Sequence, residues 1–152
     1  KESINYIEAS GLLFISNSLL KNGDDRFAEF SYSKIINNTS KTFINDLTFP
    51  FYINNAQMLG SKTEYEKSIK VTNEGIKKFI YENGLDKLLS LYCLKALGEK
   101  NLYPDNRFEI SLKKVFALLF VEDNNDRYKE YEKFIKKSFK LSSLDLEKYR
   151  IL

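Results

Sequence analysis

The side chains of this sequence that could do chemistry are carboxylates, lysines and one cysteine, because the chain contains no histidine. Without histidine, imidazole acid–base catalysis, Ser-His-Asp and Cys-His arrangements and His-containing zinc sites are excluded. Cys93 has no basic neighbour in the sequence that would activate its thiol, so we expect it to pack in the core. Any active site would therefore have to be built from carboxylates.

Two short stretches bring charged side chains together. "LFVEDNND" contains Glu122, Asp123 and Asp126, but it lacks the ligand spacing of a calcium loop and is more typical of a solvated turn. "SLKKVFALLF" places Lys113 and Lys114 inside an otherwise apolar segment. We expect that segment to be buried on most sides, where a charge normally has a partner or a role.

The elements that position these residues are predicted to be helices, since apolar residues recur at helical spacing and strand-like alternation is missing. The predicted helices span 5–20, 26–46, 64–82, 85–92, 107–122 and 126–140. We interpret residues 47–61, around Pro50, as a loop with a short helix. The predicted fold class is all-α. The absence of linkers, low-complexity tracts and repeats predicts a single domain over residues 1–152.

Composition limits the classes of function. The 152 residues carry 24 Lys and Arg against 21 Asp and Glu, a net charge of +3, which permits a nucleic-acid partner without requiring one. Lysines gather in "EGIKKFI", "LKKVF" and "FIKKSFK", a pattern most often seen on solvated helix faces. No apolar run reaches the roughly 20 residues that span a bilayer, so no membrane association is expected. A single cysteine fits a reducing compartment, and a first residue Lys1 suggests part of a longer chain.

Several segments, in order, resemble the endonuclease domain of the ribonuclease III family over about residues 10–140. "FISNS" (14–18) stands where the family has an Ala-Leu-Thr-His-Ser-like segment, and "RFAEFSYS" (26–33) aligns with its signature while keeping only Glu29-Phe30. The next two segments follow at the spacing seen in the family: Asn73 through Gly84-Leu85, and then "ISLKKVFALLFVED" (110–123). The last segment, "YEKFIKKSF" (131–139), is similar to the family's closing helix. The resemblance implies the family's helical endonuclease fold, with the 26–46 and 107–122 segments together in the core.

The resemblance also implies that the metal site is lost. Active members bind Mg²⁺ through four carboxylates, and only Glu29 keeps one here. The other three ligand positions carry Ser33, Ser111 and Lys114. We expect no metal, no cofactor and no catalysis, and Lys114 could form a salt bridge with Glu29 in place of the cation.

The function that the resemblance implies is structural. Catalytically inactive members resemble components of the mitochondrial large ribosomal subunit, so we expect a protein of the mitochondrial matrix that contacts ribosomal RNA and other ribosomal proteins. In the family the signature helix forms the dimer interface, which would here place a paralogue, or a second copy, against Phe27, Phe30, Ile35 and Ile36. Two alternatives remain open: an active double-stranded RNA endonuclease with unusual ligands, and a helical interaction module that binds no RNA.

Overall fold

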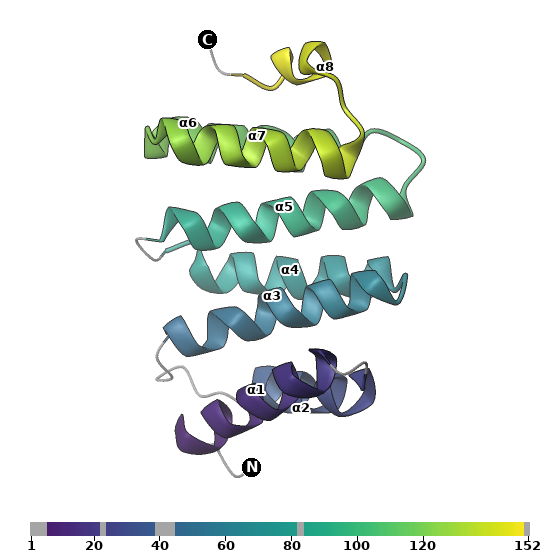
Figure 1. Ribbon diagram of the computed structural model, residues 1–152, viewed down its shortest axis with the longest axis vertical. Coiled ribbons are helices and arrows are strands. Elements are labelled where there is room, and N and C mark those ends of the chain that lie inside the picture. Colours follow the sequence, from purple (N-terminus) through teal and green to yellow (C-terminus); the bar gives the residue numbers. More distant parts are fainter. Residues whose placement is uncertain (1–5, 22–23, 39–44, 82–83, 151–152) are drawn as a thin grey trace. The chain divides into compact units, whose positions relative to one another are not determined.

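A computed structural model describes residues 6–21, 24–38, 45–81 and 84–150. Within these ranges the regular structure is entirely helical, which confirms the predicted all-α class. The eight helices of the described residues are α1 Tyr6–Lys21, α2 Asp25–Asn38, α3 Asn45–Ser61, α4 Tyr65–Phe79, α5 Leu85–Leu102, α6 Phe108–Glu122, α7 Asn125–Phe139 and α8 Ser143–Glu147 (Figure 1). None of these helices combines the length and the apolar character needed to cross a bilayer.

The chain divides into two compact units, Lys1–Glu64 and Tyr65–Leu152, called unit 1 and unit 2 below. In unit 1, α2 packs against both α1 and α3. Its core contains Ala9, Ala28 and Ile35, each fully buried, and an edge-to-face contact between the rings of Tyr32 and Phe51, whose centroids are 5.8 Å apart. Small alanines let α1 and α2 approach, and the aromatic pair fills the space between α2 and α3.

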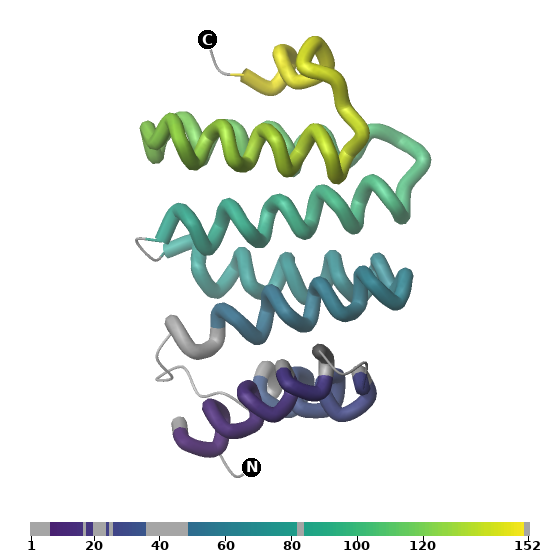
Figure 2. The backbone as a smooth tube through the Cα atoms, in the orientation of Figure 1, coloured from purple at the N-terminus to yellow at the C-terminus, as the bar shows by residue number. Residues whose placement is uncertain are grey.

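Unit 2 is built around α5, which packs against α4, α6 and α7. α5 and α6 run antiparallel and are joined by residues 103–107 (Figure 2). α5 ends where it does because Pro104 disfavours helical backbone at the preceding residue. Tyr103 is accordingly extended, with φ −108° and ψ 132°. The short helix α8 is followed by Tyr149, whose ring stacks on that of Phe116 in α6 with centroids 6.0 Å apart.

Four of the predicted helices are confirmed to within a few residues: 5–20, 64–82, 107–122 and 126–140 correspond to α1, α4, α6 and α7. The prediction of a loop with only a short helix over 47–61 is wrong, because α3 runs through the whole of this range with Pro50 inside it. Pro50 is the sixth residue of α3, so it removes only one bond of the helix, that to the carbonyl of Asp46, close to the N-terminal end.

Two further boundaries differ from the prediction. The helix predicted over 26–46 ends at Asn38, and a new helix begins at Asn45, while residues 39–44 lie outside the described ranges. The helix predicted over 85–92 continues to Leu102, since its extension contains strong helix formers such as Ala96, Leu97 and Lys100. Gly98 within the extension allows a close approach of α4: a Cβ there would lie 2.9 Å from Cγ1 of Ile69.

The expectation that 107–122 is buried on nearly every side is also wrong. Leu112, Val115 and Leu119 are buried, but Lys113 and Lys114 are exposed on another face of α6. Ile110, Phe120 and Val121 are exposed as well. The two lysines are therefore not charges inside a core; they lie on an open helix face that is also rich in apolar side chains.

Candidate functional site

In unit 1, the positions that the resemblance predicts as former metal ligands, Glu29 and Ser33, do not gather carboxylates. Nζ of Lys62 lies 3.1 Å from Oε2 of Glu29, and the two side chains are 24% and 39% exposed. An ion pair this open contributes about 0–1 kcal/mol of stability. Ser33, one helical turn after Glu29, is exposed. Glu29 thus belongs to a surface ion pair between α2 and the end of α3.

In unit 2, the positions predicted from the resemblance are Ser111 and Lys114, and both lie on α6. Ser111 is buried, and its hydroxyl donates a hydrogen bond of 2.7 Å to Oε2 of Glu99 on α5. The other oxygen of Glu99 lies 3.7 Å from Nζ of Lys95, and the Glu99 side chain is only 12% exposed. This network joins α5 to α6 and satisfies a hydroxyl that would be costly to bury alone.

Lys114 has an aromatic neighbour. Its ammonium group lies 5.1 Å from the ring centroid of Tyr92 on α5, within cation–π range. Two predictions concern contacts between unit 1 and unit 2: the salt bridge of Lys114 with Glu29, and the packing of 26–46 against 107–122. Both stay predictions.

The acidic turn after α6 has a structural role. Glu122 accepts a hydrogen bond from the guanidinium group of Arg127, and the side chain of Asn124 caps α7 by accepting from the backbone N–H of Arg127 at 3.1 Å. Asp123 ends α6 in the left-handed region, with φ 50°. Across the described residues no three His, Cys, Asp or Glu side chains come together as a potential metal site. Cys93 is buried, and burial raises the pKa of its thiol to about 12.

The strongest concentration of one charge lies at the C-terminal end of α7. Residues 133–140 contain Lys133, Lys136, Lys137 and Lys140 and no acidic residue; we call these four side chains the α7 basic cluster. Lys133, Lys137 and Lys140 are exposed. The C-terminus of a helix favours cations, so this position does not oppose the helix dipole.

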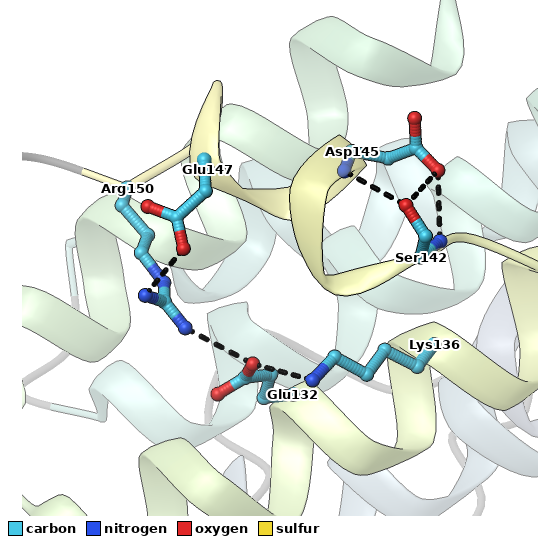
Figure 3. Close-up of polar contacts among 6 residues, drawn as sticks. All are labelled: Glu132, Lys136, Ser142, Asp145, Glu147 and Arg150. Carbon is cyan, nitrogen blue, oxygen red and sulfur yellow. Dashed lines mark hydrogen bonds and ion pairs between the residues drawn. The ribbon is translucent and has the colours of Figure 1, made fainter.

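One acidic residue touches the α7 basic cluster. Glu132 forms ion pairs with Lys136 at 2.8 Å and with Arg150 at 3.1 Å (Figure 3). The hydrogen bond from Lys136 lowers the pKa of the Glu132 carboxyl. Arg150 also reaches Glu147 of α8, at 2.7 Å, so this pairing ties α8 to α7. For the other three lysines of the cluster, no ion pair occurs with any residue that the structure describes.

Lys100 of α5 extends the positive region. Its ammonium group donates a hydrogen bond to the carbonyl of Phe139, at the end of α7. Burial and, secondarily, repulsion from Lys140 lower the pKa of Lys100. Unit 2 as a whole carries 18 Lys and Arg against 14 Asp and Glu, whereas unit 1 carries 6 against 7. The excess positive charge of the chain therefore belongs to unit 2.

The residues predicted as a partner interface fall into three groups. Phe27 and Phe30 on α2 are 38% and 61% exposed. Ile35 is fully buried, so it adds nothing to an exposed patch, and the side chain of Ile36 lies outside the described part of the structure. Ile7 and Phe14 of α1, which sequence reasoning did not select, are 81% and 76% exposed.

Sequence reasoning also missed Glu99, Lys95 and Lys100. The four-residue spacing of Lys95 and Glu99 could have indicated their ion pair, but no sequence signal joins Glu99 to Ser111 or Lys100 to Phe139, because both contacts depend on how the helices pack. Comparison with protein-family models, curated proteins and solved structures finds no match to this chain.

Proposed function

We propose that this chain is a non-catalytic helical protein that associates with structured RNA through the α7 basic cluster. The observation that carries the proposal is the run of four lysines at the end of α7, three of them exposed and none of those three in an ion pair within the described ranges. Lysines so placed can neutralise phosphates and release counterions, which gives salt-dependent binding that does not read sequence.

In its narrower form, the proposal follows the resemblance to the ribonuclease III family. The chain would be an inactive, ribonuclease III-like component of the mitochondrial large ribosomal subunit, located in the matrix and in contact with ribosomal RNA and other ribosomal proteins. Lost catalysis is supported by Ser33, Ser111 and Lys114 at ligand positions. Ser111 is further supported as a structural residue by its hydrogen bond to Glu99.

Association with a paralogue, or with a second copy, is supported by the exposed aromatic side chains of α2. Phe27 and Phe30 are separated by three residues and share one side of the helix. Exposed apolar patches on soluble proteins commonly mark contacts with other proteins.

The proposal predicts a specific salt dependence of RNA binding. Affinity for a double-stranded RNA would be measured by fluorescence anisotropy at several salt concentrations, for the wild-type chain and for Lys133→Ala/Lys137→Ala. Losing two phosphate contacts should weaken binding and reduce the slope of log K against log salt by about 2.

The control variant is Lys70→Ala/Lys77→Ala. It removes two exposed lysines from α4, where Glu66 and Glu74 also lie. Equal effects of the two double variants would contradict the α7 basic cluster as the binding site. The same RNA, incubated with Mg²⁺, should remain intact; cleavage products that disappear in Glu29→Ala would contradict the non-catalytic assignment.

A further inference from the structure

Helix α6 presents an exposed face that the proposed function does not use. Ile110, Phe120 and Val121 on this face are 65%, 58% and 66% exposed. Lys113 and Lys114 are exposed between them, and Ala117 is half-buried. Steps of three, four and seven residues place these side chains on one side of a helix. We call this set, Ile110, Lys113, Lys114, Ala117, Phe120 and Val121, the α6 strip.

The rest of α6 is occupied. Leu112, Val115 and Leu119 are buried in unit 2. Another side of α6 is contacted by the residues that follow α8: Tyr149 stacks on Phe116, and Lys148 forms an ion pair of 2.6 Å with Glu109. The α6 strip is therefore the part of α6 that neither α5 nor the residues after α8 cover.

The spacing of the α6 strip suits a second helix. Ile110, Lys113, Ala117 and Phe120 follow one another at steps of three, four and three residues, as the a and d positions of a coiled-coil seam do. Half-buried Ala117 between Ile110 and Phe120 leaves a shallow position into which a larger side chain of another helix can fit. Because the strip spans only two heptads, a partner helix would need about four turns to cover it.

The charge of the α6 strip selects the kind of helix. Within the described ranges neither Lys113 nor Lys114 forms an ion pair: Glu109, the carboxylate that acts on Lys113 at longer range, is paired with Lys148. The ammonium group of Lys114 contacts the ring of Tyr92. A second copy of this chain would set lysines against lysines. Phosphates would satisfy the lysines but leave Ile110 and Val121 without apolar contact. A helix that carries carboxylates beside apolar residues matches both the lysines and the apolar side chains of the α6 strip.

We propose that the α6 strip docks an acidic amphipathic helix of a partner protein. The apolar side chains of that helix cover Ile110, Phe120 and Val121, and its carboxylates pair with Lys113 and Lys114. This inference is independent of RNA binding at the α7 basic cluster.

The test uses the full chain and two fluorescein-labelled helical peptides of 18 residues. Both carry Leu at the a and d positions; one has Glu at the flanking positions, and the other has Lys there. Measured by anisotropy, the acidic peptide should bind at least tenfold more tightly than the basic one. Lys113→Glu/Lys114→Glu should reverse this order, and Phe120→Ser should weaken binding of the acidic peptide at least tenfold.

Matched variants locate the effect. Tyr81 is 94% exposed, so Tyr81→Ser removes an exposed aromatic ring elsewhere in unit 2 and should leave binding unchanged. Lys70→Glu/Lys77→Glu makes the same charge change on α4 and should not reverse the peptide order. Equal binding of the two peptides, or binding unaffected by Phe120→Ser, would overturn the proposal. Self-association of the chain that Phe120→Ser abolishes would also overturn it, because the strip would then bind a second copy. Double-stranded RNA that displaces the peptide equally from the wild-type chain and from Lys133→Ala/Lys137→Ala would overturn it too, because the strip itself would then bind RNA.

Discussion

Ser111, which the resemblance predicts at a former ligand position, has a local structural role. Its buried hydroxyl donates to Glu99 at 2.7 Å, and Glu99 also pairs with Lys95. A hydrogen bond to a charged acceptor contributes more than one between neutral groups, and removing the donor leaves the carboxylate less well solvated.

We predict that Ser111→Ala lowers the free energy of unfolding by about 1–2 kcal/mol, because the bond from a buried donor to a carboxylate is lost. Chemical denaturation monitored by circular dichroism would measure the change. Ser33→Ala is the control: Ser33 is exposed on α2, so its removal should change stability by less than about 0.5 kcal/mol. Equal effects at the two serines would contradict a structural role for the Ser111–Glu99 bond.

At the scale of elements, the contact between α4 and α5 depends on a glycine. Gly98 is buried in α5, and a Cβ atom added to it would lie only 2.9 Å from Cγ1 of Ile69 on α4. Gly11 in α1 is the contrasting case, since it is exposed and a Cβ there would meet nothing within 4 Å. Substitution of Gly98 therefore tests close helix packing, whereas substitution of Gly11 tests helix propensity alone.

We expect Gly98→Ala to lower the free energy of unfolding by about 1–3 kcal/mol, because the added methyl group forces α4 and α5 apart. Gly11→Ala should instead raise it by about 0.5–1 kcal/mol, through the higher helix propensity of alanine. Thermal and urea denaturation of both variants would measure these changes. A stabilised Gly98→Ala protein would show that the close approach of Ile69 does not constrain the helix pair.

At the scale of the whole molecule, the chain separates into units with different surfaces. Both units expose aromatic and aliphatic side chains, on α1 and α2 in unit 1 and on α6 in unit 2, but only unit 2 carries the excess positive charge. The proposed functions follow this division: protein association at Phe27 and Phe30, RNA contact at the α7 basic cluster, and an acidic helix on the α6 strip.

We predict that residues 65–152 fold when produced alone, because α5 is packed by α4, α6 and α7 of the same unit and Tyr149 stacks on Phe116 of α6. Helical circular dichroism and a cooperative urea transition would be measured on this fragment and on the full chain. Slow hydrogen exchange should appear in α5 and α6 of both. A fragment without a cooperative transition would show that unit 2 depends on unit 1.

Local patterns in the sequence were sufficient for the fold class and for most helices. Apolar spacing and helix propensity act within a few residues, so α1, α4, α6 and α7 could be placed without tertiary information. The lack of histidine is likewise visible in the sequence. The substitution of metal ligands follows only from the proposed resemblance to the ribonuclease III family.

Which face each helix buries was decided only by tertiary structure. α6 is apolar nearly all round, so its sequence predicted burial, but α5 and the residues after α8 cover only part of it and leave Ile110, Phe120 and Val121 exposed. The partners of Ser111 and Lys100 lie 12 and 39 residues away in the chain, beyond any local pattern. α3 runs through Pro50, and the buried Phe51 beside it packs against Tyr32 of another helix, a contact that no local pattern shows.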